Sequence, residues 1–447
     1  MPVWATTLSA MAQLSIPSSR MISRDYDLTT RKNSSLCKLF TISNVPTYMG
    51  IAPEGQTPEN DIVADMTWHV AEGSGMVQLH PLVPLQYVYQ QQHNAVVGAT
   101  WLEHHDKFAA LIAKHSPRHV VEIGGGHGYL AMKLLFTDAV KKWTMVDPNP
   151  LAVFPMPSLT IVRKYIEDMT FLPEGVDAVV HSHALEHIYD PWLFFARLRN
   201  IMVVGGLHIF SVPNLYELAR QDAPCLHFEH TLLLREEWVD GLLVAHGFEL
   251  VEKVPFGGIH SIFYVARLAR KVADEPAHRS RPVRFVDSGA VAQRWYRHLT
   301  NDAQAATLQL STNISLNFLF AAHAGSQYLL AVGMPEQRFA SILDNNPNKV
   351  GRRLYGSRLW VQAPSAIAGL PSPRIVLRQG AYNSEISAQL LAINPSSVIV
   401  KLGGGAERLP EPARIDHGAD QRGSSGAHTR CRERQRGCTA ASAKKCV

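Results

Sequence analysis

The sequence predicts an α/β protein built on a doubly wound parallel sheet, with a second, smaller αβ domain after it. From His119 onward, short apolar runs rich in β-branched residues alternate with helical segments, which is the pattern of parallel sheets. A glycine-rich run at Gly124–Gly128 lies where the first strand turns into a helix. The same alternation resumes beyond a charged, proline-containing stretch at 271–282. These three observations define the fold class.

The first sheet is predicted from the segments between residues 119 and 269. Strands are expected at 119–124, 143–147, 159–168, 176–183, 206–214, 248–256 and 260–269, and helices at 129–140, 190–203 and 235–248. The last two strands join through Gly257 and Gly258, so we expect a closing hairpin there. Apolar residues at helical spacing predict one or two further helices within Leu85–His115.

Changes in composition predict where the domains begin and end. We expect a mostly irregular segment at 1–60, a helical lead-in within 61–116, the first αβ domain at 117–270, the second at 286–402 and a tail at 403–447. Residues 1–60 are rich in Ser, Thr, Pro and Asn, which favour loops. The tail has almost no aliphatic residues and cannot bury enough surface to fold, so we expect it to be disordered.

Charge and composition exclude several classes of protein. The 447 residues carry a net charge of +5, but the tail holds nine Lys and Arg against five Asp and Glu, so the folded part is near neutral. Nothing there resembles a basic stripe for nucleic acid. The chain has no stretch of about 18 consecutive apolar residues, so we expect no membrane span. No basic residues precede the first apolar segment, so we expect no secretory signal. Few cysteines, three of five in the tail, favour a reducing cytoplasm over a disulfide framework.

The glycine-rich run indicates a nucleoside-containing cofactor. Gly124, Gly126 and Gly128 let the backbone turn tightly and let a ligand approach closely. Asp147 ends the next strand, 23 residues after Gly124, where an acid can accept two hydroxyl donors of a ribose. A dinucleotide fingerprint requires a small residue at the sixth position, where this chain has Tyr129. We therefore disfavour a dehydrogenase.

With Glu122 before it, the run reads acid-x-Gly-x-Gly-x-Gly and resembles the loop that binds S-adenosylmethionine (SAM) in class I methyltransferases. The resemblance implies a seven-stranded Rossmann-like sheet. It also makes Glu167 and Asp168, after the third strand, candidates for the adenine amino group. Residues 177–187, which contain Ser182, resemble the family's fourth-strand motif beside the SAM methionine. His187 in this motif is open to two interpretations, a buried histidine that caps the next turn or a catalytic group.

Further segments make the chain similar to C-methyltransferases that act on nucleotide-linked keto-deoxysugars. The similarity covers roughly residues 65–402 and rests on segments at 75–79, 87–89, 324–326, 344–351 and 381–386. It implies that Tyr89 and His105 belong to a helical lid over the cofactor, and that the sugar nucleotide lies between the two αβ domains. The expected cofactor is SAM, and the expected partner is a small molecule.

The catalytic candidates lie in His227-Phe-Glu229-His230. Carbon methylation requires a base that removes a proton beside a carbonyl group. A histidine with a near-neutral pKa suits this role, and an adjacent carboxylate can hold it. The resembling family reads Tyr-x-Glu-His here, with the histidine as base. Glu229 and His230 match that pattern, whereas His227 replaces the tyrosine.

The family's amino-terminal module binds zinc through two Cys-x-x-Cys pairs, and this chain departs from that pattern. Only Cys37 remains, with Phe40 in place of its mate, and the second pair corresponds to Ala71 and Ser74. Residues 61–116 thus contain a degenerate remnant of that module together with the lid. We expect no structural zinc, because such a site needs four ligands, and we predict no other metal site.

These observations favour SAM-dependent C-methylation of a nucleotide-activated keto-deoxysugar through a histidine-assisted enolate. Two alternatives remain open. One is an O- or N-methyltransferase that reuses the same SAM domain on another small molecule. The other is a SAM-binding protein with impaired catalysis, which the lost cysteines and the altered tyrosine position would accompany.

Overall fold

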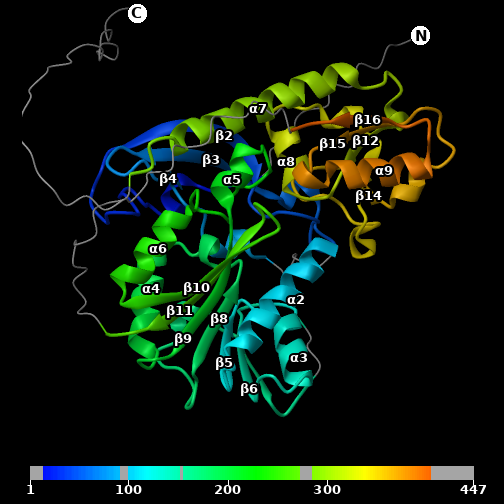
Figure 1. Ribbon diagram of the computed structural model, residues 1–447. Coiled ribbons are helices and arrows are strands. Elements are labelled where there is room, and N and C mark those ends of the chain that lie inside the picture. Colours follow the sequence, from blue (N-terminus) through cyan, green and yellow to red (C-terminus); the bar gives the residue numbers. More distant parts are fainter. Residues whose placement is uncertain (1–13, 91–98, 152–154, 272–283, 404–447) are drawn as a thin grey trace, which may run out of the picture. The chain divides into compact units, whose positions relative to one another are not determined.

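The computed structural model describes residues 14–90, 99–151, 155–271 and 284–403 (Figure 1). These residues belong to one compact unit that contains three sheets. The expected linker lies almost entirely in 272–283 and the expected disordered tail almost entirely in 404–447, outside the described residues.

The central element is a seven-stranded sheet with the order β10-β11-β9-β8-β5-β6-β7. Its strands are β5 (His119–Ile123), β6 (Lys142–Val146), β7 (Leu159–Val162), β8 (Ala178–Ser182), β9 (Leu207–Pro213), β10 (Phe248–Phe256) and β11 (Ser261–Leu268). Strands β5 to β9 are parallel to one another, whereas β11 is antiparallel to both β9 and β10. The predicted seven-stranded sheet and its closing hairpin are confirmed.

Helices cover both faces of this sheet (Figure 1). The helices α2 (Ala99–Lys114) and α3 (Tyr129–Phe136) bury apolar side chains with one face, and α4 (Pro191–Ile201) and α6 (Glu236–Ala245) bury theirs with the other. Helix α4 begins with proline at its first position and with the Asp190 carboxylate accepting from the Leu193 N–H, a favourable start. The sheet is therefore buried on both faces, as parallel strands require.

The amino-terminal part contains a second sheet. Its strands are β1 (Leu14–Ser15), β2 (Leu36–Pro46), β3 (Ile62–Ala71) and β4 (Val77–Leu79), in the order β1-β3-β2 with β4 paired to β3. The prediction of mostly irregular structure for 1–60 is wrong for β2. Ser, Thr, Pro and Asn give residues 1–60 as a whole a loop-like composition, but Leu36–Pro46 carries apolar side chains such as Phe40, Ile42 and Val45 and pairs antiparallel with β3.

Helix α7 (Ser288–Gln309) packs against this sheet. The ring of Phe40 stacks on Tyr296 at a centroid distance of 4.6 Å and an interplanar angle of 2°. An apolar stack therefore occupies one of the positions where the resembling family has a zinc ligand.

The other positions of the lost zinc module take part in ordinary packing and hydrogen bonding. The Cys37 thiol donates to the Glu72 carboxylate at 3.0 Å. The Ser74 hydroxyl donates to Asp27 at 2.9 Å, and Ala71 is fully buried. These side chains stand where the resembling family has the ligands of its zinc module.

The carboxy-terminal part forms a five-stranded parallel sheet with the order β14-β13-β12-β15-β16. Its strands are β12 (Asn317–Phe320), β13 (Ser341–Leu343), β14 (Val361–Gln362), β15 (Arg374–Leu377) and β16 (Val398–Lys401), with helices α8 (Ala324–Ala331) and α9 (Asn383–Ile393). The predicted second αβ region is present. The strand order reverses direction between β12 and β15, and open α/β sheets bind ligands at such a point.

The remaining elements are short. They are α1 (Leu85–Val88), α5 (Leu215–Arg220) and the 3-10 turns η1 (Ser18–Arg20), η2 (Pro58–Asn60), η3 (Ile166–Asp168), η4 (Leu185–His187), η5 (Ile314–Leu316), η6 (Glu336–Arg338), η7 (Pro347–Lys349), η8 (Pro364–Ile367) and η9 (Gly380–Tyr382). Among the described residues, no helix has both the length and the apolar character needed to cross a membrane.

Candidate active site

The glycine run forms the turn between β5 and α3. Gly124, Gly126 and Gly128 have φ angles of 71°, 43° and 67°, a region that residues with a β-carbon rarely adopt. A β-carbon on Gly125 would lie 2.6 Å from both the Glu122 carboxylate and the Met145 sulfur. Each of these positions therefore requires glycine for a local physical reason.

Asp147, at the end of β6, closes the turn. One of its carboxylate oxygens accepts from the Gly126 N–H at 2.9 Å and the other from the Asn149 N–H at 2.7 Å. The side chain is 6% exposed. A carboxylate offers roughly four acceptor sites, so about two remain for hydroxyl donors. This arrangement fits the vicinal hydroxyls of a ribose beside the glycine turn.

Glu122 lies beneath the turn. It is 4% exposed and accepts from the Trp143 indole N–H at 2.9 Å. Burial, the largest effect, raises the pKa of its carboxyl to about 7, and the nearby Asp147 charge adds to this increase. The side chain thus supports the loop from inside the sheet.

The other predicted cofactor residues fall into two groups. Ser182, at the end of β8, shares a 2.9 Å hydrogen bond with Ser211, and Asp168 is exposed in η3 after β7. The backbone of Glu167 lies in the same turn, but its side chain is outside the described part of the chain. The Tyr89 hydroxyl instead lies 2.6 Å from Nδ1 of His187, so Tyr89 belongs with the histidines described next.

The candidate catalytic residues gather beside η4. Nδ1 of His187 is 3.7 Å from the Glu229 carboxylate, and the rings of His187 and His230 lie nearly perpendicular with centroids 5.0 Å apart. The His227 ring lies against His230 at 3.7 Å between centroids. A β-carbon on Gly124 would be 3.9 Å from Ala184, the residue before η4. His187 therefore lies three residues after the residue that borders the glycine turn, and it brings His230 near that turn.

His230 has a defined orientation. Its Nδ1 lies 2.8 Å from the Cys225 carbonyl oxygen, a contact that assigns the proton to Nδ1 and leaves the lone pair on Nε2. The sequence-based expectation of a near-neutral pKa is wrong, because burial lowers the pKa of His230 to about 3, although the Glu229 charge opposes this effect. The imidazole is therefore neutral at ordinary pH.

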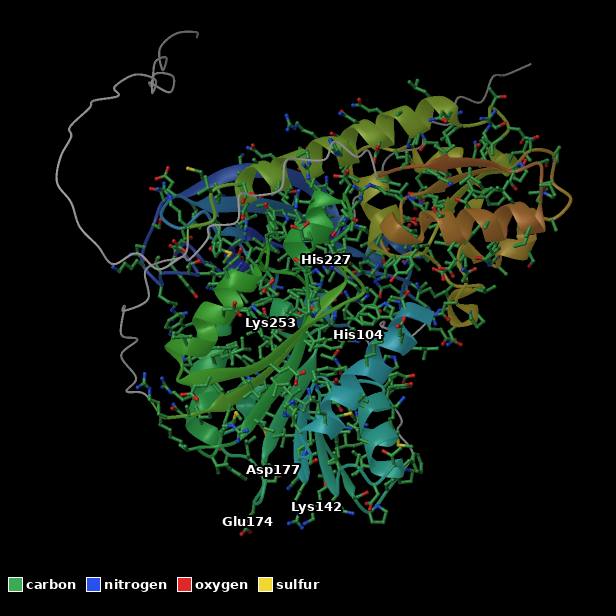
Figure 2. The ribbon with its side chains drawn as sticks, in the orientation of Figure 1. His104, Lys142, Glu174, Asp177, His227 and Lys253 are labelled. Carbon is green, nitrogen blue, oxygen red and sulfur yellow. The ribbon has the colours of Figure 1, made fainter. Side chains whose placement is uncertain are left out.

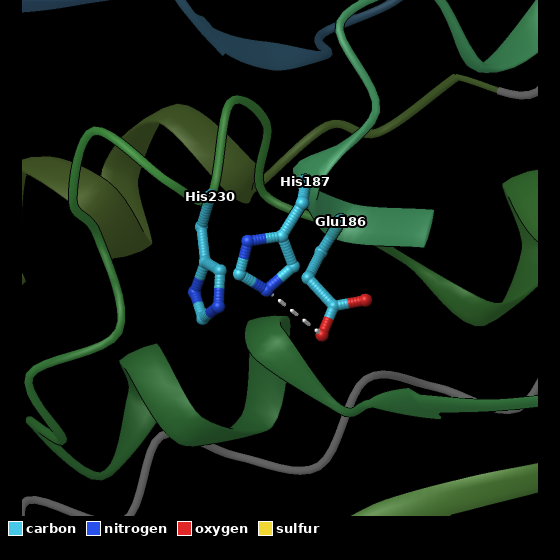
Figure 3. A group of neighbouring side chains, drawn as sticks. All are labelled: Glu186, His187 and His230. Atoms are coloured by element: carbon cyan, nitrogen blue, oxygen red, sulfur yellow. Dashed lines mark ion pairs between the residues drawn. The ribbon is translucent and has the colours of Figure 1, made fainter. Parts of the chain in front are cut away.

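Glu186 is a residue that the sequence analysis missed. It is fully buried, and burial raises the pKa of its carboxyl to about 8. Its Oε1 lies 3.6 Å from Nδ1 of His183 and 3.8 Å from Nε2 of His187. Within the described residues, Glu186, His187 and His230 are the group whose donor atoms converge closely enough for a metal ion (Figure 3). The Glu-His pair after the fourth strand was the available signal.

Comparisons with known proteins identify the part of the chain that holds the glycine turn. A family model described as a methyltransferase domain matches residues 97–253. An uncharacterized methyltransferase of Mycolicibacterium paratuberculosis is 31% identical over 123 residues, which are 26% of this chain and 45% of that protein. A probable S-adenosylmethionine-dependent methyltransferase of Mycolicibacterium smegmatis is 26% identical over 175 residues, 38% of this chain and 65% of that protein.

The match runs from the residues just before α2 to within β10 and includes the glycine turn, so residues 97–253 resemble a methyltransferase domain. The chain spans about half to two thirds of the length of these relatives. A solved Haloferax volcanii complex of the Trm112 methyltransferase activator with a methyltransferase aligns over 38% of this chain and 92% of that chain, at 16% identity and a TM-score of 0.34.

Helix α2 places a second group of aromatic residues on the methyltransferase domain. The Trp101 ring contacts His183 and His260, each with centroids 4.9 Å apart. His104 is fully buried beside them, and burial lowers its pKa to about 3. Figure 2 shows His104 and His227 towards the same end of the central sheet. His105 lies on this helix as expected for a lid, whereas residues 91–98 are outside the described range.

Proposed function

We propose that the protein transfers a methyl group from SAM to a carbon atom of a nucleotide-activated keto-deoxysugar. His230 removes the proton from the carbon next to the keto group. The observation that carries this proposal is the place of His230 near both the central seven-stranded sheet and the carboxy-terminal parallel sheet. It contacts His187, beside the glycine turn, and His323 is close enough for its charge to lower the pKa of His230.

His323 directly precedes α8, at the carboxyl end of β12. Ligands of open α/β sheets bind beyond the carboxyl ends of the strands, where the strand order reverses. The carboxyl ends of β12 and β15 lie at such a point. This position supports a nucleotide on the second sheet and its sugar next to His230, with the methyltransferase domain on the other side.

The proposed chemistry begins with His230. Its Nε2 lone pair accepts the proton, the C–H electron pair forms the enolate, and the enolate carbon then attacks the methyl group. When bound, SAM would supply that electrophilic methyl group, and its sulfur–methyl bond would break with the electron pair staying on sulfur, so that S-adenosylhomocysteine leaves. A histidine with a pKa of about 3 is a weak base alone, but the negative charge that develops on the enolate stabilises the imidazolium beside it. Glu229, whose charge raises the pKa of His230, acts in the same direction.

His227 occupies the position of the tyrosine in the resembling C-methyltransferases. Its ring lies 3.7 Å from that of His230, at an interplanar angle of 34°. In our proposal His227 positions His230, and it presents an imidazole to the substrate where the resembling enzymes have a phenolic hydroxyl. This substitution changes the polar groups that face the sugar, so it bears on which sugar the enzyme accepts.

The test is methyl transfer from isotope-labelled SAM to a panel of keto-deoxysugar nucleotides, followed by mass spectrometry. His230→Ala should reduce turnover by about 100-fold or more, because general-base catalysis is worth roughly that factor. His115→Ala is the matched control, since His115 pairs with Glu252. A second readout is solvent deuterium entering the carbon next to the keto group without SAM, which should also require His230.

The outcomes separate the alternatives. Methylation at oxygen or nitrogen that survives His230→Ala would favour an O- or N-methyltransferase and overturn the proposal. SAM binding without transfer to any of the tested sugar nucleotides would favour a protein with impaired catalysis. Loss of deuterium exchange together with carbon methylation in the His230 variant is the result that we expect.

A further inference from the structure

We propose that Glu186, His187 and His230 bind a divalent ion of the zinc type. Their donor atoms all lie within 4.8 Å of one another. Figure 3 shows the two imidazoles and the carboxylate facing a common space. Two imidazole nitrogens and one carboxylate oxygen are the ligand set of many zinc sites that keep an open position for a further ligand.

The distances are close to those that such an ion requires. Zinc bonds of about 2.0–2.1 Å in a tetrahedral arrangement place two ligand atoms about 3.4 Å apart. Nε2 of His187 lies 3.8 Å from Oε1 of Glu186. This pair is within about 0.4 Å of the tetrahedral spacing, and all donor atoms of the group lie within 4.8 Å of one another.

Glu186 supplies an independent reason to expect a ligand. It is fully buried, and neither oxygen has a hydrogen-bond partner elsewhere in the described chain; the donor that does approach is its own backbone N–H. Burying a carboxyl group without donors costs free energy. A cation bound to the carboxylate would compensate for its missing hydrogen-bond donors. The two neighbouring histidines do not, because they lie 3.6–3.8 Å away.

The surroundings also hold the two histidines as metal ligands require. Metal-bound histidines commonly use their second nitrogen for a hydrogen bond that fixes the ring. Nδ1 of His230 is 2.8 Å from the Cys225 carbonyl, and Nδ1 of His187 is 2.6 Å from the Tyr89 hydroxyl. Each ring thus has an orienting partner on Nδ1.

Such an ion would act as an inhibitor. It would occupy the Nε2 lone pair of His230, the pair that accepts the proton in our proposed mechanism. Inhibition therefore rests on the proposed function, whereas binding of the ion does not. Mg²⁺ and Ca²⁺ prefer shells of oxygen ligands, so they should not compete at this mixed site.

The test is a titration of the untagged full-length chain with Co²⁺, after chelator treatment, followed by visible absorption. We expect a component with the intensity of four- or five-coordinate Co²⁺ that Zn²⁺ displaces and Mg²⁺ does not. Glu186→Gln and His187→Asn should each weaken this component by about tenfold or more, since each removes one of three ligands. Glu252→Gln, which alters an acid paired with His115 elsewhere, should leave it unchanged.

Cys431, Cys438 and Cys446 of the tail can also bind cobalt. All variants share the tail, so the difference from the wild type isolates the proposed site. Near-ultraviolet circular dichroism checks that each variant is folded. If either Glu186→Gln or His187→Asn fails to fold, the other variant still tests the site. Equal binding by the wild type and both folded variants would overturn the inference. Cobalt binding by a protein whose metal-free form transfers no methyl group to any tested sugar nucleotide would instead count against the proposed function alone.

Discussion

Asp147 provides a direct test of the SAM site, through the substitution Asp147→Asn. Its two carboxylate oxygens accept the backbone N–H groups of Gly126 and Asn149 at 2.9 and 2.7 Å. Asparagine offers one carbonyl oxygen and one NH₂ group, so one of these N–H groups would face a donor. The size and shape of the side chain hardly change, and the substitution therefore removes charge and one acceptor without creating a cavity.

The magnitude follows from these contacts. A buried N–H left without an acceptor costs about 1–3 kcal/mol of folding stability. A ribose hydroxyl that loses a charged acceptor costs about 1.5–3 kcal/mol of binding, which corresponds to about 10- to 150-fold in affinity. Since the side chain is 6% exposed, solvent compensates little of either loss. We therefore expect Asp147→Asn to weaken SAM binding by about one to two orders of magnitude, which is the cost of losing one hydrogen bond to a charged acceptor.

Isothermal titration calorimetry with SAM measures the affinity, and urea unfolding measures stability. Asp177→Asn is the matched control, because the Asp177 carboxylate also accepts backbone N–H groups, those of Arg118 and His119 at 2.9–3.1 Å. Figure 2 shows Asp177 at the end of the sheet away from His104. The control should lose stability but keep its SAM affinity. Binding by Asp147→Asn within about threefold of the wild type, or an equal loss in both variants, would refute the reasoning.

Two further predictions concern stability. His181 and His208 are fully buried and share a 3.0 Å contact; burial lowers the pKa of His181 to about 3 and that of His208 well below 6.5. Their stabilising contribution is complete above pH 6.5 and is lost as the pH falls towards 3, by about 2 kcal/mol for His181 between pH 6.5 and 5. Urea unfolding at both pH values checks this, and an unchanged slope in His181→Gln would contradict it. Phe40→Ala should cost about 3–5 kcal/mol because it removes the stack on Tyr296. Chelators should leave the melting temperature of the Glu186→Gln variant, which lacks the proposed ion site, unchanged; a chelator-induced drop in that variant would indicate a structural metal elsewhere.

The parts of the site that the sequence predicted are those determined by local geometry. The glycine turn requires positive φ angles within five residues, and Asp147 follows at the end of the next strand. Both features belong to one strand–turn–helix–strand unit. The alternation of apolar strands with helices likewise indicates a parallel sheet that is buried on both faces. These features can be predicted from the sequence without knowing which distant segments contact one another.

The rest depended on contacts between distant segments. Tyr89 and His187 are 98 residues apart in sequence and 2.6 Å apart in space, so the sequence placed Tyr89 with the cofactor rather than with the histidines. Strand β2 has apolar side chains of its own, but the loop-like composition of residues 1–60 as a whole concealed it, and the sequence did not indicate its pairing with β3. The pKa of His230 depends on how completely other segments exclude water from it, and no local pattern carries that information.

The energetic character of the histidine group argues for function. Glu186, His187 and His230 place titratable groups in a region where apolar side chains would pack at lower cost. They come from two separate segments, and Tyr89 joins them from a third. Departures from the rules of stable packing concentrate at functional sites. The lost zinc positions show the opposite behaviour, because the Phe40–Tyr296 stack there satisfies ordinary packing. Selection for stability alone therefore accounts for the amino-terminal sheet but not for the polar group beside η4, and that contrast supports our proposal that the chemistry takes place at η4.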